Sequence, residues 1–249
     1  MPPCSRDIEL PLVESFGLVA GMDEVGRGAI AGPVCVGVCV VGPETGQPPA
    51  GLTDSKLLTA KRREALVDPA ARWVAASAVG AASAAEIDQI GIVAALRLAG
   101  RRALHAVSAQ GYAPSFVLLD GSHDWLSEPQ ADLFSFDAAV PTPQIGGAHA
   151  TAPGGLGPGE RGMYGPGSAA LAYDGPVQTL VKGDARVSVI AAASVLAKVR
   201  RDAYMAGLAD PGYGWASNKG YGAAVHYRGI AAHGLSEQHR RSWNLPGTD

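Results

Sequence analysis

The sequence has few of the features that mark secreted and membrane proteins. It holds three cysteines in 249 residues, too few for a disulfide framework, which excludes a stapled secreted scaffold. No uninterrupted apolar run approaches the roughly 18 residues that a membrane helix needs. The first seven residues lack the basic and apolar regions of a secretory signal. We therefore expect a cytoplasmic protein that contacts no membrane.

Aromatic and charged residues are also scarce, at 6% and 17% of the chain. The core should therefore be aliphatic and rich in alanine. The formal net charge is only −3, but residues 182–249 carry nine Lys or Arg against five Asp or Glu, whereas residues 1–181 carry eleven against eighteen. This asymmetry fits either a nucleic-acid-binding face or ordinary variation of the surface.

Glycine and proline are abundant and concentrated in one segment. Residues 141–176 contain ten Gly and six Pro and show no apolar periodicity. We predict a flexible insertion, with irregular edges, over residues 123–176. It is either a solvated loop or a docking segment for another protein.

The remaining sequence alternates between strand and helix patterns. Strands are predicted at residues 16–22, 34–41, 73–81, 116–119 and 177–181, and helices at 59–66, 83–105 and 187–205. Pro69 should halt the first helix, and Ser83 with Glu86 forms a capping box for the second. This order predicts an α/β fold, a sheet covered by helices.

Acidic residues stand where apolar runs end. Asp23 and Glu24, Asp120, and Asp184 each follow such a run. Four carboxylates gathered at a sheet rim would repel unless cations neutralise them, and hard oxygen ligands favour Mg²⁺ or Mn²⁺ over Zn²⁺. The alternative is that each acid caps a turn or a helix.

Two of the cysteines are spaced so that they share one face of a predicted strand. These are Cys35 and Cys39, in the strand at residues 34–41. No further Cys or His pattern surrounds them, so we predict buried thiols rather than a zinc site.

The surroundings of Asp23 carry a family resemblance. The segment Asp23–Gly28 with Gly32–Pro33 resembles ribonuclease HII. The resemblance continues in the family's order through Asp54–Leu57, Leu119–Gly121, Lys182–Ala185, Ile190–Ser194, Ala197–Val199, Arg201–Asp202, Pro211–Gly214, Asn218–Gly222, His226, His239–Arg240 and Ser242–Trp243. It implies a ribonuclease H-like mixed sheet flanked by helices, with a catalytic domain over 17–243 that follows an N-terminal extension at 1–16 and turns helical from about 203.

The resemblance implies an endoribonuclease that hydrolyses the RNA strand of RNA–DNA hybrids. It also implies nicking 5′ to single ribonucleotides in duplex DNA, leaving 5′-phosphate and 3′-hydroxyl ends, by a monomer acting in ribonucleotide repair. Residues matching the family's four metal-holding carboxylates are Asp23, Glu24, Asp120 and Asp184. The implied cofactors are two divalent ions, Mn²⁺ or Mg²⁺.

Further matches imply the contacts to substrate. The loop Gly26-Arg27-Gly28 matches the one that reads the ribose, and Tyr221 the tyrosine on its 2′-hydroxyl. Ser55 and Lys56 match backbone-phosphate contacts. Alone, these residues would suggest only a tight turn, a packed tyrosine and a solvated turn before a helix. Lys182, Ser194 and Lys198 either touch phosphate or, for the last two, lie on a helix surface. The Lys and Arg of 182–249 would then track the duplex phosphates.

The chain departs from the family pattern in three places. Ala223 stands where the family commonly has Thr, which puts one hydroxyl contact near Tyr221 in doubt, and Trp243 replaces a usual Phe. The segment 123–176 exceeds the usual short connection, and Asp124 beside it fits the ligand pattern less well than Asp120.

Two other functions remain as alternatives. The sister ribonuclease HIII has a different residue in place of Arg27 and usually an extra N-terminal module. A non-catalytic RNA–DNA binding module should have lost at least one of the four carboxylates, and all four are present.

Overall fold

The computed structural model describes residues 4–128 and 173–246. Its centre is a five-stranded mixed sheet in the order β3-β2-β1-β4-β5. The strands are β1 (Val19–Val25), β2 (Val34–Val41), β3 (Ala76–Ala82), β4 (Phe116–Asp120) and β5 (Val177–Leu180). The first three are antiparallel neighbours, whereas β4 runs parallel to both β1 and β5. The predicted α/β class is confirmed. Most of the predicted insertion, residues 129–172, lies outside the described residues.

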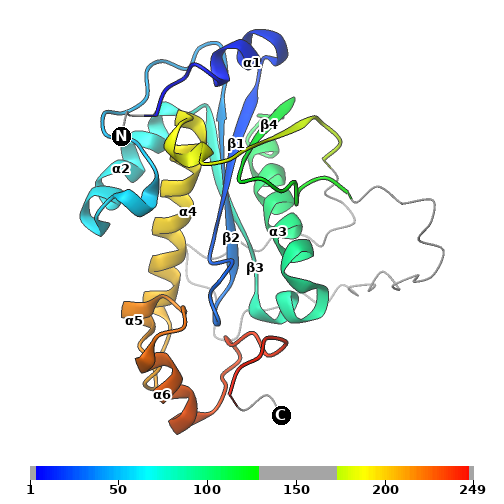
Figure 1. The fold of residues 1–249 in the computed structure, drawn as a ribbon. Helices are drawn as coiled ribbons and strands as arrows, with labels where there is room; N and C mark the ends of the chain where they lie inside the picture. Colours follow the sequence, from blue (N-terminus) through cyan, green and yellow to red (C-terminus); the bar gives the residue numbers. More distant parts are fainter. Residues whose placement is uncertain (1–3, 129–172, 247–249) are drawn as a thin grey trace, which may run out of the picture.

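Two long helices cover the two faces of this sheet (Figure 1). One is α3 (Ala84–Ser108), which begins at the predicted Ser83–Glu86 capping box, and the other is α4 (Ser188–Gly207). Gly21 allows α4 to lie directly on β1, because a Cβ there would stand 2.6 Å from the Val189 carbonyl carbon. The shorter elements are α1 (Glu9–Phe16), η1 (Ser55–Leu57), α2 (Ala60–Trp73), η3 (Gly183–Ala185), α5 (Trp215–Asn218) and α6 (Ala224–His233).

Each face of the sheet has its own apolar core. Met22, Leu96 and Leu119 belong to the core under α3, whereas Leu118 and Ile190 belong to the one under α4. This alternation follows from the two-residue period of a strand. Both predicted buried thiols, Cys35 and Cys39, are fully buried and unpaired.

The first strand begins and ends later than predicted. Phe16, the predicted start, ends helix α1, and the strand runs on through Asp23 and Glu24 to Val25. The reason is backbone pairing: Asp23 and Glu24 stand opposite Gly37 and Val36 in the antiparallel ladder with β2. A ladder depends on main-chain groups, so charged side chains at the sheet rim do not end it.

The first predicted helix also runs past its expected end. Helix α2 includes Pro69 and continues to Trp73, so the strand predicted from Trp73 starts at Ala76. The last turn is anchored by the buried Ala70 and by the Trp73 indole N–H, which donates to the Gly46 carbonyl at 2.9 Å. These tertiary contacts outweigh the hydrogen bond that proline cannot make.

The N-terminal residues are tied to the domain by a buried ion pair. Glu9 in α1 is fully buried, 2.6 Å from the Arg6 guanidinium, and its other oxygen accepts from the Val189 N–H at 3.0 Å. That N–H is one of the unpaired donors of the first turn of α4. The predicted extension therefore caps the helix that covers the sheet.

The start of the predicted insertion packs into the core. Trp125 and Leu126 are almost fully buried in the α3-side cluster, and Gly100 makes room for the Trp125 ring. Asp124 accepts hydrogen bonds from the Leu126 and Ser127 N–H groups, so it caps a turn. Residues 123–128 are therefore part of the folded domain.

Candidate active site

Two of the four carboxylates stand side by side because β1 and β4 are parallel neighbours. Met22 pairs with Leu119, so Asp23 and Asp120 follow at the same level of the sheet. The residues directly before them, Met22 and Leu119, belong to the α3-side core, so alternation along each strand places the side chains of Asp23 and Asp120 on the α4 face. The predicted gathering of acids at a sheet rim begins with this pair.

The turn after β5 brings a third carboxylate, that of Asp184, next to this pair. Asp120 Oδ1 accepts from the Gly183 N–H at 2.7 Å and from the Asp184 N–H at 3.3 Å. The preceding residue, Lys182, adopts a left-handed conformation with φ 56°, which helps the chain to turn there. Asp184, in η3, is thereby held next to Asp120.

The electrostatics of these acids show that they interact. Asp23 is only 4% exposed, and burial raises its pKa to about 8, with the charges of Asp120 and Glu24 adding to the effect and the Ser194 hydrogen bond opposing it. Burial, and next the charge of Asp120, raise the pKa of Asp184 as well. Closely spaced carboxylates with raised pKa values are typical of sites built for a cation.

Lys56 is the one lysine that pairs with these acids among the described ion pairs. Its Nζ lies 3.3 Å from Asp184 Oδ2, while its side chain remains 69% exposed. Burial would lower the pKa of Lys56, but the charges of Asp23 and Asp184 outweigh burial and raise it. An exposed ammonium beside the acidic residues can also reach a substrate phosphate.

The neighbouring Ser55 is placed differently. It is 3% exposed, and its hydroxyl is hydrogen-bonded to the Ser194 hydroxyl at 2.9 Å. A phosphate contact by this hydroxyl would require it to leave Ser194. Of the two alternatives for Ser194, a phosphate contact or a position on the helix surface, the second is wrong, because this residue is only 1% exposed.

The donor set fits a hard divalent cation. Four carboxylates, those of Asp23, Glu24, Asp120 and Asp184, come from neighbouring elements, and oxygen donors are what Mg²⁺ and Mn²⁺ prefer. In the part of the chain that the structure describes, no three acidic, His or Cys side chains converge closely enough to hold an ion as they stand. Binding an ion would therefore require these carboxylates to move closer together.

The loop after β1 presents its arginine to solvent. Gly26 has φ +83°, and a Cβ there would collide with the Arg201 guanidinium. Arg27 is about half exposed and forms a long contact of 3.4 Å with Glu24. Around Gly28 the Cβ direction is open. The loop therefore offers backbone groups and a half-exposed guanidinium to a ligand.

Two arginines of the basic C-terminal third lie inside the protein. Arg201 and Arg240 are fully buried and donate to main-chain carbonyls of the segment after β1. Arg240 reaches Gly26 at 2.6 Å and Arg27 at 2.8 Å. The expectation that the Lys and Arg of 182–249 track phosphates is therefore wrong for these two. A guanidinium with five donors can be buried where several carbonyls converge.

The sequence contains a signal for one of these buried arginines. Ser194, Ala197, Arg201 and Met205 follow one another at helical spacing, and all four are buried in α4. A charge that continues an apolar face indicates a buried cation with fixed partners.

Tyr221 lies beside this loop, on the connection between α5 and α6. It is 36% exposed, and its ring lies 5.5 Å from the Arg201 guanidinium carbon and 5.9 Å from Lys198 Nζ. Its neighbour Gly220 accepts from the Ile30 N–H at 2.9 Å, which joins the connection to the segment after β1. This hydrogen bond helps to hold the two predicted ribose contacts, the loop at residues 26–28 and Tyr221, next to each other.

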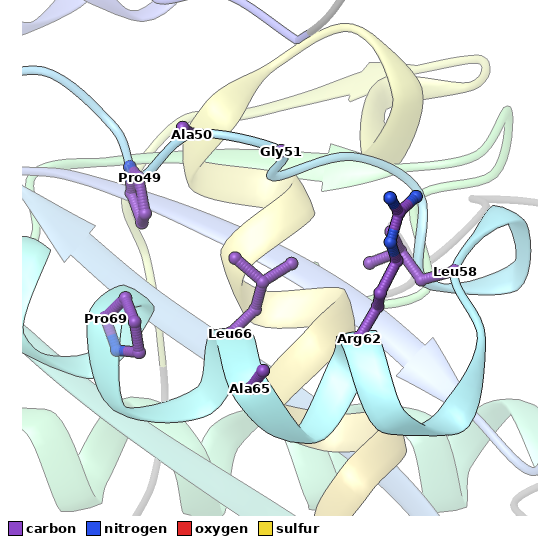
Figure 2. A pocket seen from close by; sticks show the side chains of 8 residues that line it. All are labelled: Pro49, Ala50, Gly51, Leu58, Arg62, Ala65, Leu66 and Pro69. Carbon is purple, nitrogen blue, oxygen red and sulfur yellow. The ribbon is translucent and has the colours of Figure 1, made fainter.

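A separate pocket of about 510 Å³ lies between the 49–51 loop and α2 (Figure 2). Leu66 projects from the helix toward the loop, and Arg62 stands at one end. None of its lining residues is a carboxylate, so it is distinct from the acidic residues.

Comparison with known proteins shows the family. The sequence matches the family Ribonuclease HII over residues 20–140 and 170–245. Ribonuclease HII of Streptomyces avermitilis is 38% identical over 245 residues, which are 97% of this chain and 84% of the relative. Ribonuclease HII of Ralstonia nicotianae is 37% identical over 228 residues, 91% of this chain and 76% of that relative.

Solved structures share the architecture at lower identity. The ribonuclease H2 from Pyrococcus horikoshii OT3 superposes with a TM-score of 0.54 at 20% identity, covering 91% of this chain and 94% of that one. Bst-RNase HIII in complex with Mn²⁺ gives 0.54 at 18% identity, covering 95% and 70%. No described helix is long and apolar enough to cross a membrane.

The mixed sheet and its covering helices have the ribonuclease H-like fold of those solved structures. Within that fold, the sequence matches distinguish between the two sister enzymes considered above. The chain belongs to the ribonuclease HII family and is a ribonuclease H, which acts on RNA–DNA hybrids.

Proposed function

We propose that this enzyme nicks duplex DNA 5′ to a single ribonucleotide, besides hydrolysing the RNA of hybrids, and that it uses two divalent ions. The observation that carries the proposal is the position of the acidic residues. Asp23, with its pKa raised to about 8, Asp120 and Asp184 interact at one sheet rim, and the loop that carries Arg27 follows the end of β1, the strand that contains Asp23. Cleavage and recognition of the ribose would therefore occur side by side.

In the proposed reaction, the four carboxylates bind the ions and position the attacking water. Asp23, Glu24, Asp120 and Asp184 would hold the ions and orient a water in line with the scissile phosphate. When bound there, Mg²⁺ or Mn²⁺ lowers the pKa of a water and stabilises the leaving 3′-oxygen. Hydrolysis by water leaves 5′-phosphate and 3′-hydroxyl ends.

Selection of the ribonucleotide would depend on the loop at residues 26–28 and on the α5–α6 connection, which carries Tyr221. Backbone groups at Gly26 and Gly28 can approach the minor groove closely, and Arg27 is exposed enough to bind a phosphate. The Tyr221 hydroxyl would bond the 2′-hydroxyl, the group that DNA lacks. Lys56 would bind the backbone near the ions, together with the main chain of Ser55.

The test is a labelled DNA duplex with one ribonucleotide. We expect nicking on its 5′ side in Mg²⁺ or Mn²⁺, and loss of at least 10³-fold in Asp120→Asn. Asp124→Asn is the matched control, because Asp124 only caps a turn; it should retain activity. Absence of nicking in both metals, with hybrid cleavage intact, would disprove the single-ribonucleotide activity. Duplex binding without any cleavage would instead favour the non-catalytic module.

We further propose that the enzyme acts as a cytoplasmic monomer in ribonucleotide repair. Sedimentation of the purified protein at a single mass near 25.4 kDa tests the monomer. Deleting residues 141–176 tests the insertion, and unchanged activity would leave it as a solvated loop.

A further inference from the structure

Two buried imidazoles connect Tyr221 to the C-terminal segment. His226 in α6 is fully buried, and His239 is 1% exposed. Their Nε2 atoms lie 3.0 Å apart. On the far side of each ring, His226 Nδ1 lies 3.0 Å from the Tyr221 carbonyl oxygen, and His239 Nδ1 lies 2.9 Å from the Ser236 backbone nitrogen. The four groups form one continuous chain of hydrogen bonds.

The two end groups of this hydrogen-bonded series, the Ser236 N–H and the Tyr221 carbonyl, determine which ring nitrogens carry protons. The Ser236 N–H can only donate, so His239 Nδ1 accepts and its Nε2 carries the proton. The Tyr221 carbonyl can only accept, so His226 Nδ1 carries a proton and its Nε2 accepts from His239. All bonds therefore run in one direction, from Ser236 toward Tyr221. They do so only when both rings are neutral, because a further proton would place two N–H groups face to face.

The surroundings keep both rings neutral. Burial lowers the pKa of His226, and the hydrogen bond to Tyr221 and the charge of Asp210 only partly oppose it. Burial and then the His226 ring lower the pKa of His239 to about 4, with Arg241 adding to the effect. The Tyr213 ring packs on both, with centroids 6.0 Å and 4.8 Å away.

Tyr221 has two main-chain hydrogen bonds of its own, besides the bond of its neighbour Gly220 to Ile30 and the contacts of its ring with Arg201 and Lys198. Its ring stands on the α5–α6 connection at 36% exposure, and its N–H donates to Asn218 in the preceding turn. Its carbonyl is the group that links this turn to α6 and to the segment around Ser236. A change in that bond moves the peptide that carries the ring.

We propose that His226 is a positioning residue: a neutral imidazole, held in one tautomer by His239, that sets the backbone of Tyr221 and thereby the enzyme's preference for a ribonucleotide. This rests on the proposed contact of Tyr221 with the 2′-hydroxyl. The described hydrogen bonds of the two rings go to Tyr221, to each other and to Ser236, and none goes to the four carboxylates.

Two substitutions at one position separate the two bonds of the first ring. His226→Asn places an amide nitrogen where Nδ1 lies and keeps the bond to Tyr221, whereas His226→Gln places its amide where Nε2 lies and keeps only the bond to His239. His233→Gln is the matched control. It lies on the same helix and its ring also packs against Tyr213, at 6.1 Å, but it has no described bond to the Tyr221 turn.

The readout is the ratio of dissociation constants for an all-DNA duplex and the same duplex with one ribonucleotide, measured in Ca²⁺. We expect His226→Gln to reduce this ratio by about fivefold or more, the scale of one hydrogen bond, and His226→Asn to stay within twofold of wild type. Melting temperatures are recorded alongside. Equal ratios in both variants, or a fall in His233→Gln of the same size, would overturn the positioning role.

A second measurement uses the unaltered protein. Long-range ¹H–¹⁵N spectra distinguish imidazole tautomers, and we expect the Nδ1–H form at His226 and the Nε2–H form at His239. Opposite tautomers would overturn the proposal. Failure of the proposed function is recognised separately: wild type would then show no preference for the ribonucleotide, while these tautomers would still be observed.

Discussion

Replacing Asp23 with Asn should stabilise the metal-free protein while it abolishes cleavage. The carboxyl is almost wholly buried, and burial, followed by the charges of Asp120 and Glu24, raises its pKa from 3.8 to about 8. The folded protein therefore holds this proton more tightly than the unfolded chain does. Stability falls as pH rises through the interval between those two values, and Asn, which cannot ionise, escapes that loss.

The magnitude follows from the size of the shift. At about 1.4 kcal/mol per pH unit, keeping this carboxyl protonated in the folded protein costs about 4 kcal/mol at pH 7, roughly three units above the unfolded value. An imperfectly bonded buried amide costs about 1–3 kcal/mol in return. The net gain of about 2 kcal/mol corresponds to a rise in melting temperature of about 4–8 °C for a chain of this length.

The assay is thermal unfolding in EDTA at several pH values between 5 and 9. The advantage of Asp23→Asn over wild type should grow from pH 5 to 8 and then level off. Asp68→Asn, at an exposed site on α2, is the control and should show no such trend. If Asp23→Asn melted at or below wild type across the whole range, the reasoning about the buried carboxylate would be refuted.

Four further predictions concern single residues. Glu9→Ala leaves Arg6 buried without its partner and should lower unfolding free energy by about 3–5 kcal/mol in urea titrations; a loss below about 1 kcal/mol would contradict the cap. Gly26→Ala places a Cβ against a buried guanidinium at positive φ, so we expect about 2–4 kcal/mol lost, and unchanged melting would contradict this. Arg27→Ala should change the free energy of unfolding by less than about 0.5 kcal/mol. It should also reduce the slope of log binding constant against log salt concentration for the duplex by about one, measured by fluorescence anisotropy. Ala223→Thr should add about 1 kcal/mol by capping α6, which has no side-chain cap, with no effect on cleavage if the hydroxyl is purely a cap.

Elements with strong local signals were predictable from sequence. The valine-rich strand β2 has its predicted bounds, and the Ser83–Glu86 box does begin α3. Boundaries decided by distant contacts were not predictable. Helix α2 passes Pro69 because Trp73 is anchored on the 46 loop, and β1 includes Asp23 because β2 lies opposite. Local propensity contains no information about either partner.

The candidate site divides in the same way. The four acids could be chosen from sequence, since each follows an apolar run or matches a family motif, and their chemistry alone favours a hard cation. The ion pair of Lys56 with Asp184 joins residues 128 positions apart, and the bond between Ser55 and Ser194 spans 139. Pairings at such separations exist only after the sheet and α4 have formed.

The sequence by itself determined the fold class, the family and the oxygen-donor character of the site, because these depend on residue type and order. Only the tertiary structure decided which charges remain for a nucleic acid. Counted along the chain, Arg201 and Arg240 belong to a basic surface; in the folded protein they are buried and bond the carbonyls of Gly26, Ala31 and Pro33. A guanidinium leaves water only where acceptor groups converge on it, here several carbonyls, and that convergence is a property of the folded chain.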